Sequence, residues 1–197
     1  MWGPRAGCRM LERLRGTSSR LFDGLACLAT RVGISANFTT FLGFLSFLAS
    51  SIVLLLRKPL LASAFIILGG FFDLIDGAIA RRSGDSGPKG AFIDSVADRV
   101  EDGMLFMSMG MYANDLLWAA LATHSSMLVS YIRARSESLG VKGTELSLTG
   151  RGERIVLSAI FCAADMVSLG LILITLLSYV TCLQRSYIFF KGIKGKE

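Results

Sequence analysis

The sequence predicts an all-α integral membrane protein, with six transmembrane helices preceded by an amphipathic helix at the membrane surface. Hydrophobic residues make up 52% of the 197 residues and charged residues only 18%, and the charges are clustered. The clustering leaves apolar stretches of about 20 residues, the length that an α-helix needs to span a bilayer. The chain shows no internal repeat and no low-complexity linker, so we interpret residues 1–197 as a single domain.

The apolar stretches predict a six-helix bundle over residues 37–189. The expected spans are 37–56, 60–81, 90–112, 115–134, 153–166 and 168–189. The third span stands out because it carries several ionisable residues, namely Asp94, Asp98, Arg99, Glu101 and Asp102. Charge within a membrane span indicates a functional site by default.

Residues 9–32 form a separate element before the first span. Six apolar residues are set there against five arginines: Leu11, Leu14, Leu21, Phe22, Leu25 and Leu28 against Arg9, Arg13, Arg15, Arg20 and Arg31. This pattern predicts an amphipathic helix lying on the cytoplasmic leaflet, bent near 16–19. A cleaved signal peptide is disfavoured, because the first thirty residues contain no apolar run of the required length.

The distribution of Lys and Arg predicts the orientation. Arg57 and Lys58 are the only basic residues between the first two spans, and the connectors at 113–115 and near Asp165 have none. Basic residues concentrate in cytoplasmic loops. We therefore expect a protein of the cell membrane with both termini and the loops 82–89 and 135–152 on the cytoplasmic side.

The net charge of +6 is consistent with binding to anionic lipids and phosphorylated substrates. We expect no nucleic-acid partner, since no basic patch is interleaved with aromatic residues.

Four aspartates form one spaced array near the second and third spans. The pattern is Asp73-x2-Asp76-Gly77-x2-Ala80-Arg81, eight residues, then Gly90-x3-Asp94-x3-Asp98. Residues three and four apart share one helix face, so the array predicts two facing carboxylate stripes. A solvated helix end would explain one or two of these acids, but not their spacing together with the small residues between them.

Carboxylates that converge in a low-dielectric setting need cations. Oxygen ligands with no His or Cys nearby select hard ions, so the array predicts bound Mg²⁺, with two ions expected and Mn²⁺ as the alternative. Gly77 and Ala80 leave the helix face bare, which would let a nucleotide approach the backbone.

The array resembles the signature of the CDP-alcohol phosphotransferase family, and the resemblance extends over nearly the whole chain. It implies that Asp73, Asp76 and Asp94 ligate the metal pair, and that Asp98 shares a metal and acts as the general base. It also implies that the CDP moiety contacts Asp73, Gly77, Ala80 and Arg81, that CMP is released, and that the protein is a homodimer.

Asn37 and Thr40 match an Asn-x2-Thr element that helps to hold the nucleotide in this family. A competing interpretation is helix capping, by Ser35 or by Asn37 itself.

The acceptor is predicted from three basic residues near the ends of the last three spans. The segments around Arg133, Arg154 and Arg185 resemble those of phosphatidylinositol phosphate synthases and their archaeal counterparts, where three basic residues hold the phosphate of inositol phosphate. Guanidinium groups suit a phosphate dianion. The alternative is that these arginines anchor span ends at the membrane surface.

We therefore expect a transferase that moves a lipid phosphoryl group from CDP-diacylglycerol or CDP-archaeol to inositol phosphate. Glycerol phosphate as acceptor and CDP-inositol as donor remain alternatives within the family. A non-catalytic membrane scaffold or a small transporter is the alternative of another class. The intact array of four aspartates argues against both, since a scaffold has no use for carboxylates within the membrane.

Overall fold

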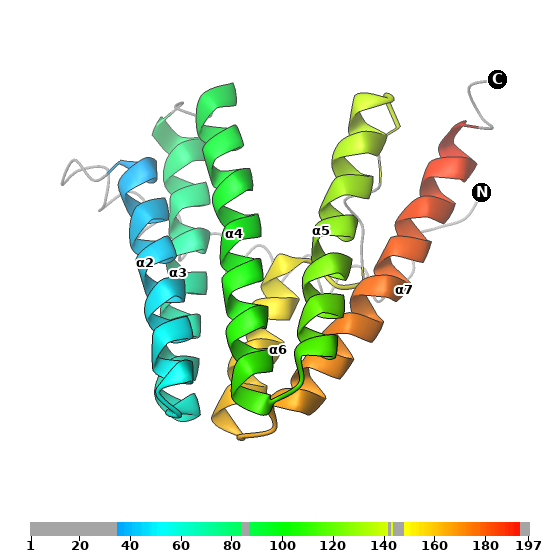
Figure 1. Cartoon of the computed structure of the whole chain (residues 1–197). Helices are drawn as coiled ribbons and strands as arrows, with labels where there is room; N and C mark the ends of the chain where they lie inside the picture. The colour runs from blue at the N-terminus through cyan, green and yellow to red at the C-terminus, as the bar shows by residue number, and fades with distance from the viewer. Residues whose placement is uncertain (1–34, 84–86, 142, 144–147, 194–197) are drawn as a thin grey trace, which may run out of the picture.

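The computed structural model describes residues 35–83, 87–141, 143 and 148–193, without the side chains of 81–83. The described residues form six helices and no strand, and the α2–α3, α4–α5 and α6–α7 turns are short (Figure 1). Their bounds are α2 (Ala36–Leu55), α3 (Pro59–Ser83), α4 (Pro88–Ala113), α5 (Leu116–Ser138), α6 (Arg151–Ala163) and α7 (Val167–Ile193). A helix occurs at each of the six predicted positions. The predicted amphipathic helix at 9–32 lies outside the described residues.

Three of the helices are long and apolar enough to cross a membrane. These are α2, α3 over Pro59–Ala80, and α7. α4 carries too many charged residues to qualify by composition, and α6 has only 13 residues, or about 20 Å of helix. That length falls short of the hydrocarbon thickness of about 30 Å. The crossing of the bilayer by α4, α5 and α6 therefore stays a prediction.

Local signals in the sequence fix where the helices begin. The Ser35 hydroxyl accepts a hydrogen bond from Phe38 N at 3.3 Å, so Ser35 is the N-cap of α2 and Asn37 is left out of the cap. Proline stands at the first position of α3 and of α4, where its missing N–H costs nothing. At α6, the Glu153 carboxylate accepts from Gly150 N at 2.8 Å, which starts that helix at Arg151.

The helices pack around an apolar core that also contains small polar residues. α2 packs along α3 and α4, α3 contacts α6, and α5 packs along α7. The apolar core contains Phe47, Leu54, Ile66, Phe106, Met109, Leu171 and Ile174. Buried serines sit among them and donate to carbonyls of their own helix, as Ser50 does to Phe47 O at 2.7 Å. Small polar residues of this kind are typical of helix contacts inside membranes.

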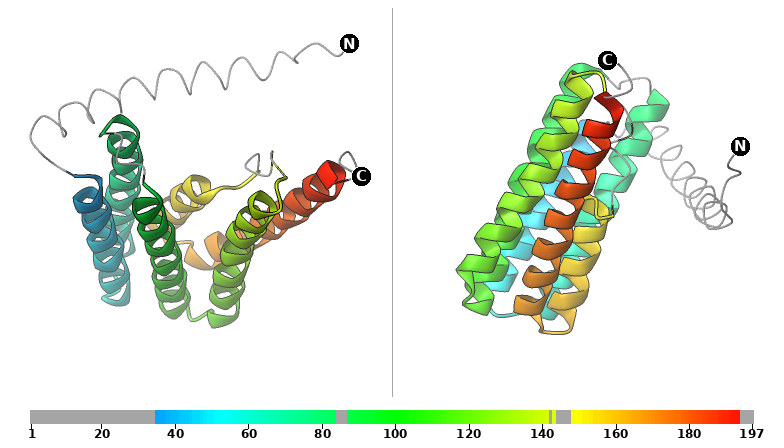
Figure 2. Two further views of the ribbon diagram at one scale, coloured as in Figure 1. Left: turned by 90° about the horizontal axis from the view of Figure 1, so that it is seen from above. Right: turned by 90° about the vertical axis from the view of Figure 1, so that its right-hand side faces the viewer.

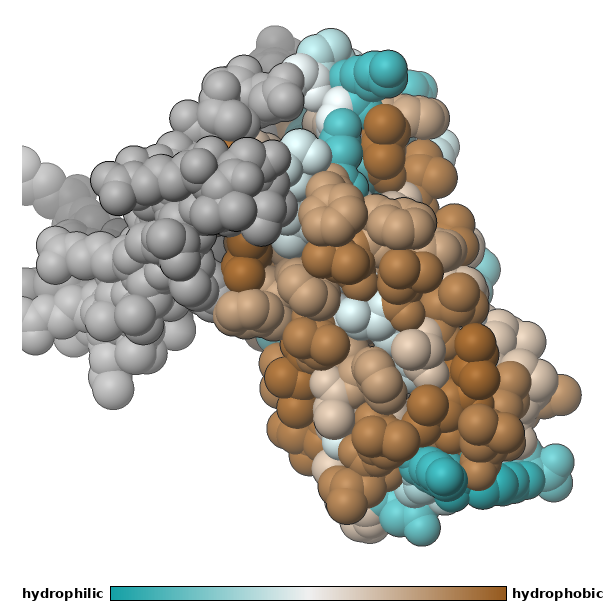
Figure 3. All heavy atoms as spheres, turned by 90° about the vertical axis from the view of Figure 1, so that its left-hand side faces the viewer, coloured by the Kyte–Doolittle hydropathy of each residue, from teal (hydrophilic) through white to brown (hydrophobic). Residues whose placement is uncertain are grey.

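The outer surface of the bundle is apolar over its middle. One face shows a broad hydrophobic area between hydrophilic ends (Figure 3). Exposed side chains of α2, α3 and α4 include Phe41, Ile52, Ile67, Leu74, Val96 and Val100. An apolar surface of this size indicates contact with lipid or with another protein.

The two ends of the bundle differ. The α2–α3, α4–α5 and α6–α7 turns lie at one end, where Arg57 Nη1 donates to Tyr112 O at 2.6 Å and Tyr112 Oη donates to Asp165 Oδ1 at 2.5 Å. Toward the other end, α5 and α7 diverge from α2, α3 and α4 (Figures 1 and 2). The turns are therefore tied together at one end, while the helices spread apart at the end that holds the aspartates.

Candidate active site

A pocket of about 330 Å³ opens between α2, α3 and α4 at the end where the helices spread apart. Six predicted residues line it: Asn37, Thr40, Asp76, Gly77, Ala80 and Asp94. Lys89 adds a positive charge to the lining. At the start of α4 the lining consists otherwise of small residues, Gly87, Gly90 and Ala91. Four predicted nucleotide contacts from α2 and α3 thus line one cavity with two predicted metal ligands, Asp76 and Asp94, whereas Asp73 is not part of its lining.

Asp76 and Asp94 are the acidic residues of this pocket. Asp76 is buried, and its Oδ2 accepts a hydrogen bond of 2.8 Å from Thr40 Oγ1, whereas Asp94 is exposed. Thr40 Oγ1 also lies 3.1 Å from Ala36 O in its own helix. The hydroxyl therefore links α2 to the carboxylate of α3. The side chain of Arg81 lies outside the described residues.

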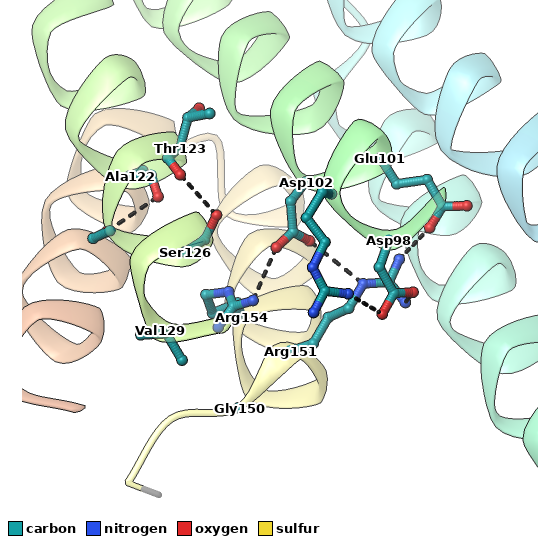
Figure 4. Close-up of polar contacts among 12 residues, drawn as sticks. Asp98, Glu101, Asp102, Ala122, Thr123, Ser126, Val129, Gly150, Arg151 and Arg154 are labelled. Carbon is teal, nitrogen blue, oxygen red and sulfur yellow. Dashed lines mark hydrogen bonds and ion pairs between the residues drawn. The ribbon is translucent and has the colours of Figure 1, made fainter. Parts of the chain in front are cut away.

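Asp73 and Asp98 both pair with the side chain of Arg151, which was not predicted from the sequence as a site residue. The Arg151 guanidinium at the start of α6 pairs with Asp73 and with Asp98 Oδ1, the latter at 2.7 Å. It also pairs with Glu101, and its Nε lies 3.5 Å from Asp102 Oδ1. Figure 4 shows Arg151 of α6 pointing toward Asp98, Glu101 and Asp102 of α4. We call Asp73, Asp98, Glu101 and Asp102 the carboxylate cluster.

The neighbours of the carboxylate cluster hold its members in place. Arg99 Nη1 bonds Asp98 Oδ2 at 3.0 Å and Ser95 O at 2.8 Å. On the other side, α2 comes so close that a Cβ at Gly43 would lie 2.9 Å from Asp73 Oδ1. Asp73 and Asp98 therefore have little freedom to move.

The donor set of the carboxylate cluster fits a hard divalent cation. Asp73, Asp98 and Glu101 each offer a carboxylate oxygen, and these oxygens lie within 4.8 Å of one another. Oxygens on opposite sides of an octahedral Mg²⁺ lie about 4.2 Å apart, so the spacing suits such an ion. Glu101 was absent from the predicted ligands, although its position three residues after Asp98 places it on the same helix face.

The three predicted acceptor arginines occupy different environments. Arg154 is 2% exposed and donates from Nη2 to Asp102 Oδ2 at 2.9 Å (Figure 4). Arg185 is also buried and donates from Nη1 to Val129 O of α5 at 2.6 Å. Arg133, four residues beyond Val129 on α5, is half exposed and pairs with Glu137 at 2.9 Å. Arg154 and Arg185 are thus held inside the bundle, while Arg133 lies on its surface.

Comparison with known proteins decides the family. The model of the CDP-alcohol phosphatidyltransferase family matches residues 33–190. The chain belongs to this family. The match includes every aspartate of the array, the pocket and the three arginines.

Relatives within the family are similar over most of their length. The archaetidylinositol phosphate synthase of Pyrococcus horikoshii is 32% identical over 90% of this chain and 95% of its own. The phosphatidylinositol phosphate synthase of Streptomyces avermitilis is 34% identical over 80% of this chain and 68% of its own. These similarities confirm an enzyme, a CDP-alcohol phosphotransferase of membrane lipid synthesis.

A solved structure shares the fold. The phosphatidylinositol phosphate synthase of Mycobacterium tuberculosis, crystallised with CDP-DAG bound, superimposes with a TM-score of 0.73 at 26% identity, covering 87% of this chain and 94% of its own. The same enzyme has been crystallised with manganese and citrate. With three helices able to cross a membrane, this family member is an integral membrane protein.

Proposed function

We propose that this chain transfers a phosphatidyl or archaetidyl group from a CDP-linked lipid to inositol phosphate and releases CMP. The choice of acceptor rests on the buried, partly unpaired guanidinium of Arg154. Its side chain is 2% exposed, and its Nε and Nη1 have no hydrogen-bond partner within the described part of the chain. Buried guanidinium donors are costly to leave unpaired. A phosphate group would satisfy them.

The other basic residues support the same assignment. Arg185 lies beside Val129, and Arg133 follows one helical turn later, so α5, α6 and α7 each contribute a guanidinium to this side of the bundle. The synthases from Pyrococcus horikoshii and Streptomyces avermitilis carry names that specify inositol phosphate lipids as products. Glycerol phosphate would also bring a phosphate to these arginines, so the two acceptors must be compared directly.

The pocket between α2, α3 and α4 is the proposed site of the CDP moiety. Asn37 and Thr40 would contact it from α2, Gly77 and Ala80 would let it approach α3, and Lys89 would face its phosphates. Asp73, Asp76, Asp94 and Asp98 would hold the divalent ions, which when bound supply charge stabilisation at the reacting phosphoryl group. Mg²⁺ is the proposed ion and Mn²⁺ its substitute.

In the proposed reaction, the acceptor hydroxyl oxygen attacks the β-phosphorus of the CDP-linked lipid. A new P–O bond forms, the bond from the β-phosphorus to the bridging oxygen breaks, and CMP leaves with that oxygen. Asp98 accepts the hydroxyl proton. The direct displacement needs no covalent intermediate on the enzyme.

We propose that the pocket opens to the cytoplasm. Among the described residues, Lys89, Arg133, Arg135 and Lys191 lie toward the pocket end of their helices, and Arg57 and Lys58 lie in a turn at the opposite end. This asymmetry favours cytoplasmic termini. A fluorescent protein fused to the C-terminus should fluoresce in cells, whereas periplasmic alkaline phosphatase at the same position should be inactive. The reverse pattern would contradict the orientation.

The acceptor assignment is tested by Arg154→Gln, with Arg135→Gln as a control that removes the same charge from an exposed position of α5. We expect the first variant to raise the KM for inositol phosphate by about 10-fold or more, because a hydrogen bond to a charged group contributes about 1.5–3 kcal/mol. The KM for the CDP-linked lipid should stay near that of the wild type. If neither KM moves, Arg154 is a structural residue and the acceptor assignment loses its support.

A further inference from the structure

We propose that Arg151 is a tethered counter-ion of the carboxylate cluster, which exchanges places with the divalent cation during the enzyme's cycle. The inference rests on the proposed metal role of Asp73 and Asp98. Its starting point is that one guanidinium pairs with both of these residues and with Glu101 and Asp102 as well. The four acids come from α3 and α4, and the cation comes from α6.

Arg151 uses the oxygens that a divalent ion would need. Arg151 Nη1 pairs with Asp73 Oδ2 and lies 2.7 Å from Asp98 Oδ1. The other oxygen of Asp98, Oδ2, pairs with Arg99 Nη1 at 3.0 Å. A Mg²⁺ ion lies about 2.1 Å from each of its ligand oxygens. An ion bound to the same oxygens would therefore lie in contact with the guanidinium. Two cations so close together repel strongly in a setting of low dielectric constant, so the two arrangements exclude each other.

The position of Arg151 allows it to move. Its side chain is 18% exposed, compared with 2% for Arg154, which is enclosed among α4, α5 and α6. Arg151 is the first residue of α6, and it stands between Gly150 and Gly152. A Cβ at Gly152 would meet no atom within 4 Å, so space lies open beside it. In the proposed exchange, rotation of the Arg151 side chain toward this space would carry the guanidinium away from Asp73 and Asp98.

Glu101 gives Arg151 a partner outside the aspartate array. The Glu101 carboxylate is 1% exposed, and its Oε1 has no hydrogen-bond partner among the described residues. Without a nearby cation, this buried carboxylate would be strongly unfavourable. Arg151 or a divalent ion can each neutralise it. The carboxylate cluster therefore always needs one cation, and Arg151 supplies it whenever the ion does not.

The exchange predicts that removing the guanidinium strengthens metal binding. When a competitor occupies the site in part of the molecules, the apparent Kd for the ion equals the intrinsic Kd divided by the fraction of molecules whose site is free. Binding of Mn²⁺ to the purified full chain, followed by electron paramagnetic resonance without any substrate, should show a Kd for Arg151→Gln that is lower than that of the wild type. We expect a decrease between about 5-fold and 150-fold, the usual range of coupling between two sites. The stabilisation of the variant by Mn²⁺, measured as the shift in Tm, should increase as well.

Two further variants make the test specific. Arg151→Lys keeps the charge but loses the planar fork, so its Kd should fall between those of the wild type and Arg151→Gln. If Arg151→Gln does not fold, Arg151→Lys carries the comparison alone. Arg135→Gln removes the same charge at an exposed position and should leave the Kd unchanged.

An unchanged or weaker Mn²⁺ affinity of Arg151→Gln would overturn the exchange while leaving the proposed reaction in place. Equal tightening by Arg135→Gln would also overturn it, because the effect would then come from overall charge. If the wild type does not bind Mn²⁺, or Asp73→Asn and Asp98→Asn do not weaken binding, the proposed metal site fails and the exchange fails with it.

Discussion

Thr40 on α2 donates a hydrogen bond of 2.8 Å to the buried carboxylate of Asp76 on α3, directly at the wall of the candidate nucleotide pocket. The contact joins the Asn-x2-Thr element to the aspartate array, two motifs that lie 36 residues apart in the chain. It holds the Asp76 carboxylate from the side of α2. The α2 motif therefore positions a carboxylate as well as lining the cavity.

Thr40→Val should impair the reaction while leaving the fold intact. Valine keeps the shape of threonine but cannot donate to Asp76, and hydrogen bonds to charged groups contribute about 1.5–3 kcal/mol. We expect kcat/KM for CMP release to fall roughly 10-fold to 100-fold. Thr40→Ser keeps the hydroxyl and should retain most of the activity. Equal activity of the valine and serine variants would show that the bond has no catalytic importance.

Gly43→Ala should disturb the carboxylate cluster from the opposite side. The new methyl group would lie 2.9 Å from Asp73 Oδ1, so the carboxylate or the helix must shift. Shifts of about 1 Å at a reacting centre can cost about 100-fold in rate. The matched control is Gly103→Ala on α4, where the methyl would meet only Thr123 Cγ2 at 4.0 Å. Wild-type kcat in both variants would contradict the role given to Asp73.

Gly110→Ala tests packing at a distance from the site. A Cβ there would overlap Ala119 Cβ and lie 3.2 Å from Asp115 O, at the contact between α4 and α5. Overpacking of this kind costs about 1–3 kcal/mol. We expect a lower Tm in detergent, with unchanged activity per folded molecule at low temperature. A Tm equal to that of the wild type would mean that α4 and α5 separate more easily than the structure indicates.

Asp98→Asn tests the two roles proposed for Asp98, as general base and as metal ligand. An amide has nearly the same shape as the carboxylate but cannot take the proton of the acceptor hydroxyl, so transfer should slow by about 10²-fold to 10⁴-fold. Binding of the CDP-linked lipid should persist, because Asp98 does not line the pocket proposed for it. Turnover near that of the wild type would remove the assignment, and loss of lipid binding would point to a role in the ground state instead.

Periodicity and spacing were sufficient to predict much of this molecule. Apolar stretches located the six helices within a few residues, and the i, i+3 and i+4 spacing placed Asp76, Gly77 and Ala80 on one face, which the structure shows lining a pocket with Asp94. The sequence offered Ser35 and Asn37 as capping residues of the first span, and the structure shows Ser35 in that position. Asn37 lines the pocket, and its contact with a nucleotide stays a prediction.

Arg151 could not be placed from sequence. Its distance from Asp73 along the chain is 78 residues, and no periodic pattern relates the start of α6 to the faces of α3 and α4. Glu101 and Asp102 did carry a signal, because they follow Asp98 by three and four residues on one helix. Interpreting them only as charges in a span missed their shared partner. Long-range pairing of this kind depends on how the helices pack, which local patterns do not specify.

The most direct test of the account is CMP release by the purified protein with Mg²⁺ and CDP-diacylglycerol or CDP-archaeol, comparing inositol phosphate, free inositol and glycerol phosphate as acceptors. We predict release that depends on both Mg²⁺ and inositol phosphate, with little release from free inositol, which lacks the phosphate that Arg154 would bind. Release with glycerol phosphate alone would contradict the acceptor assignment. Absence of release with every acceptor would contradict the proposed reaction and favour a CDP-inositol donor.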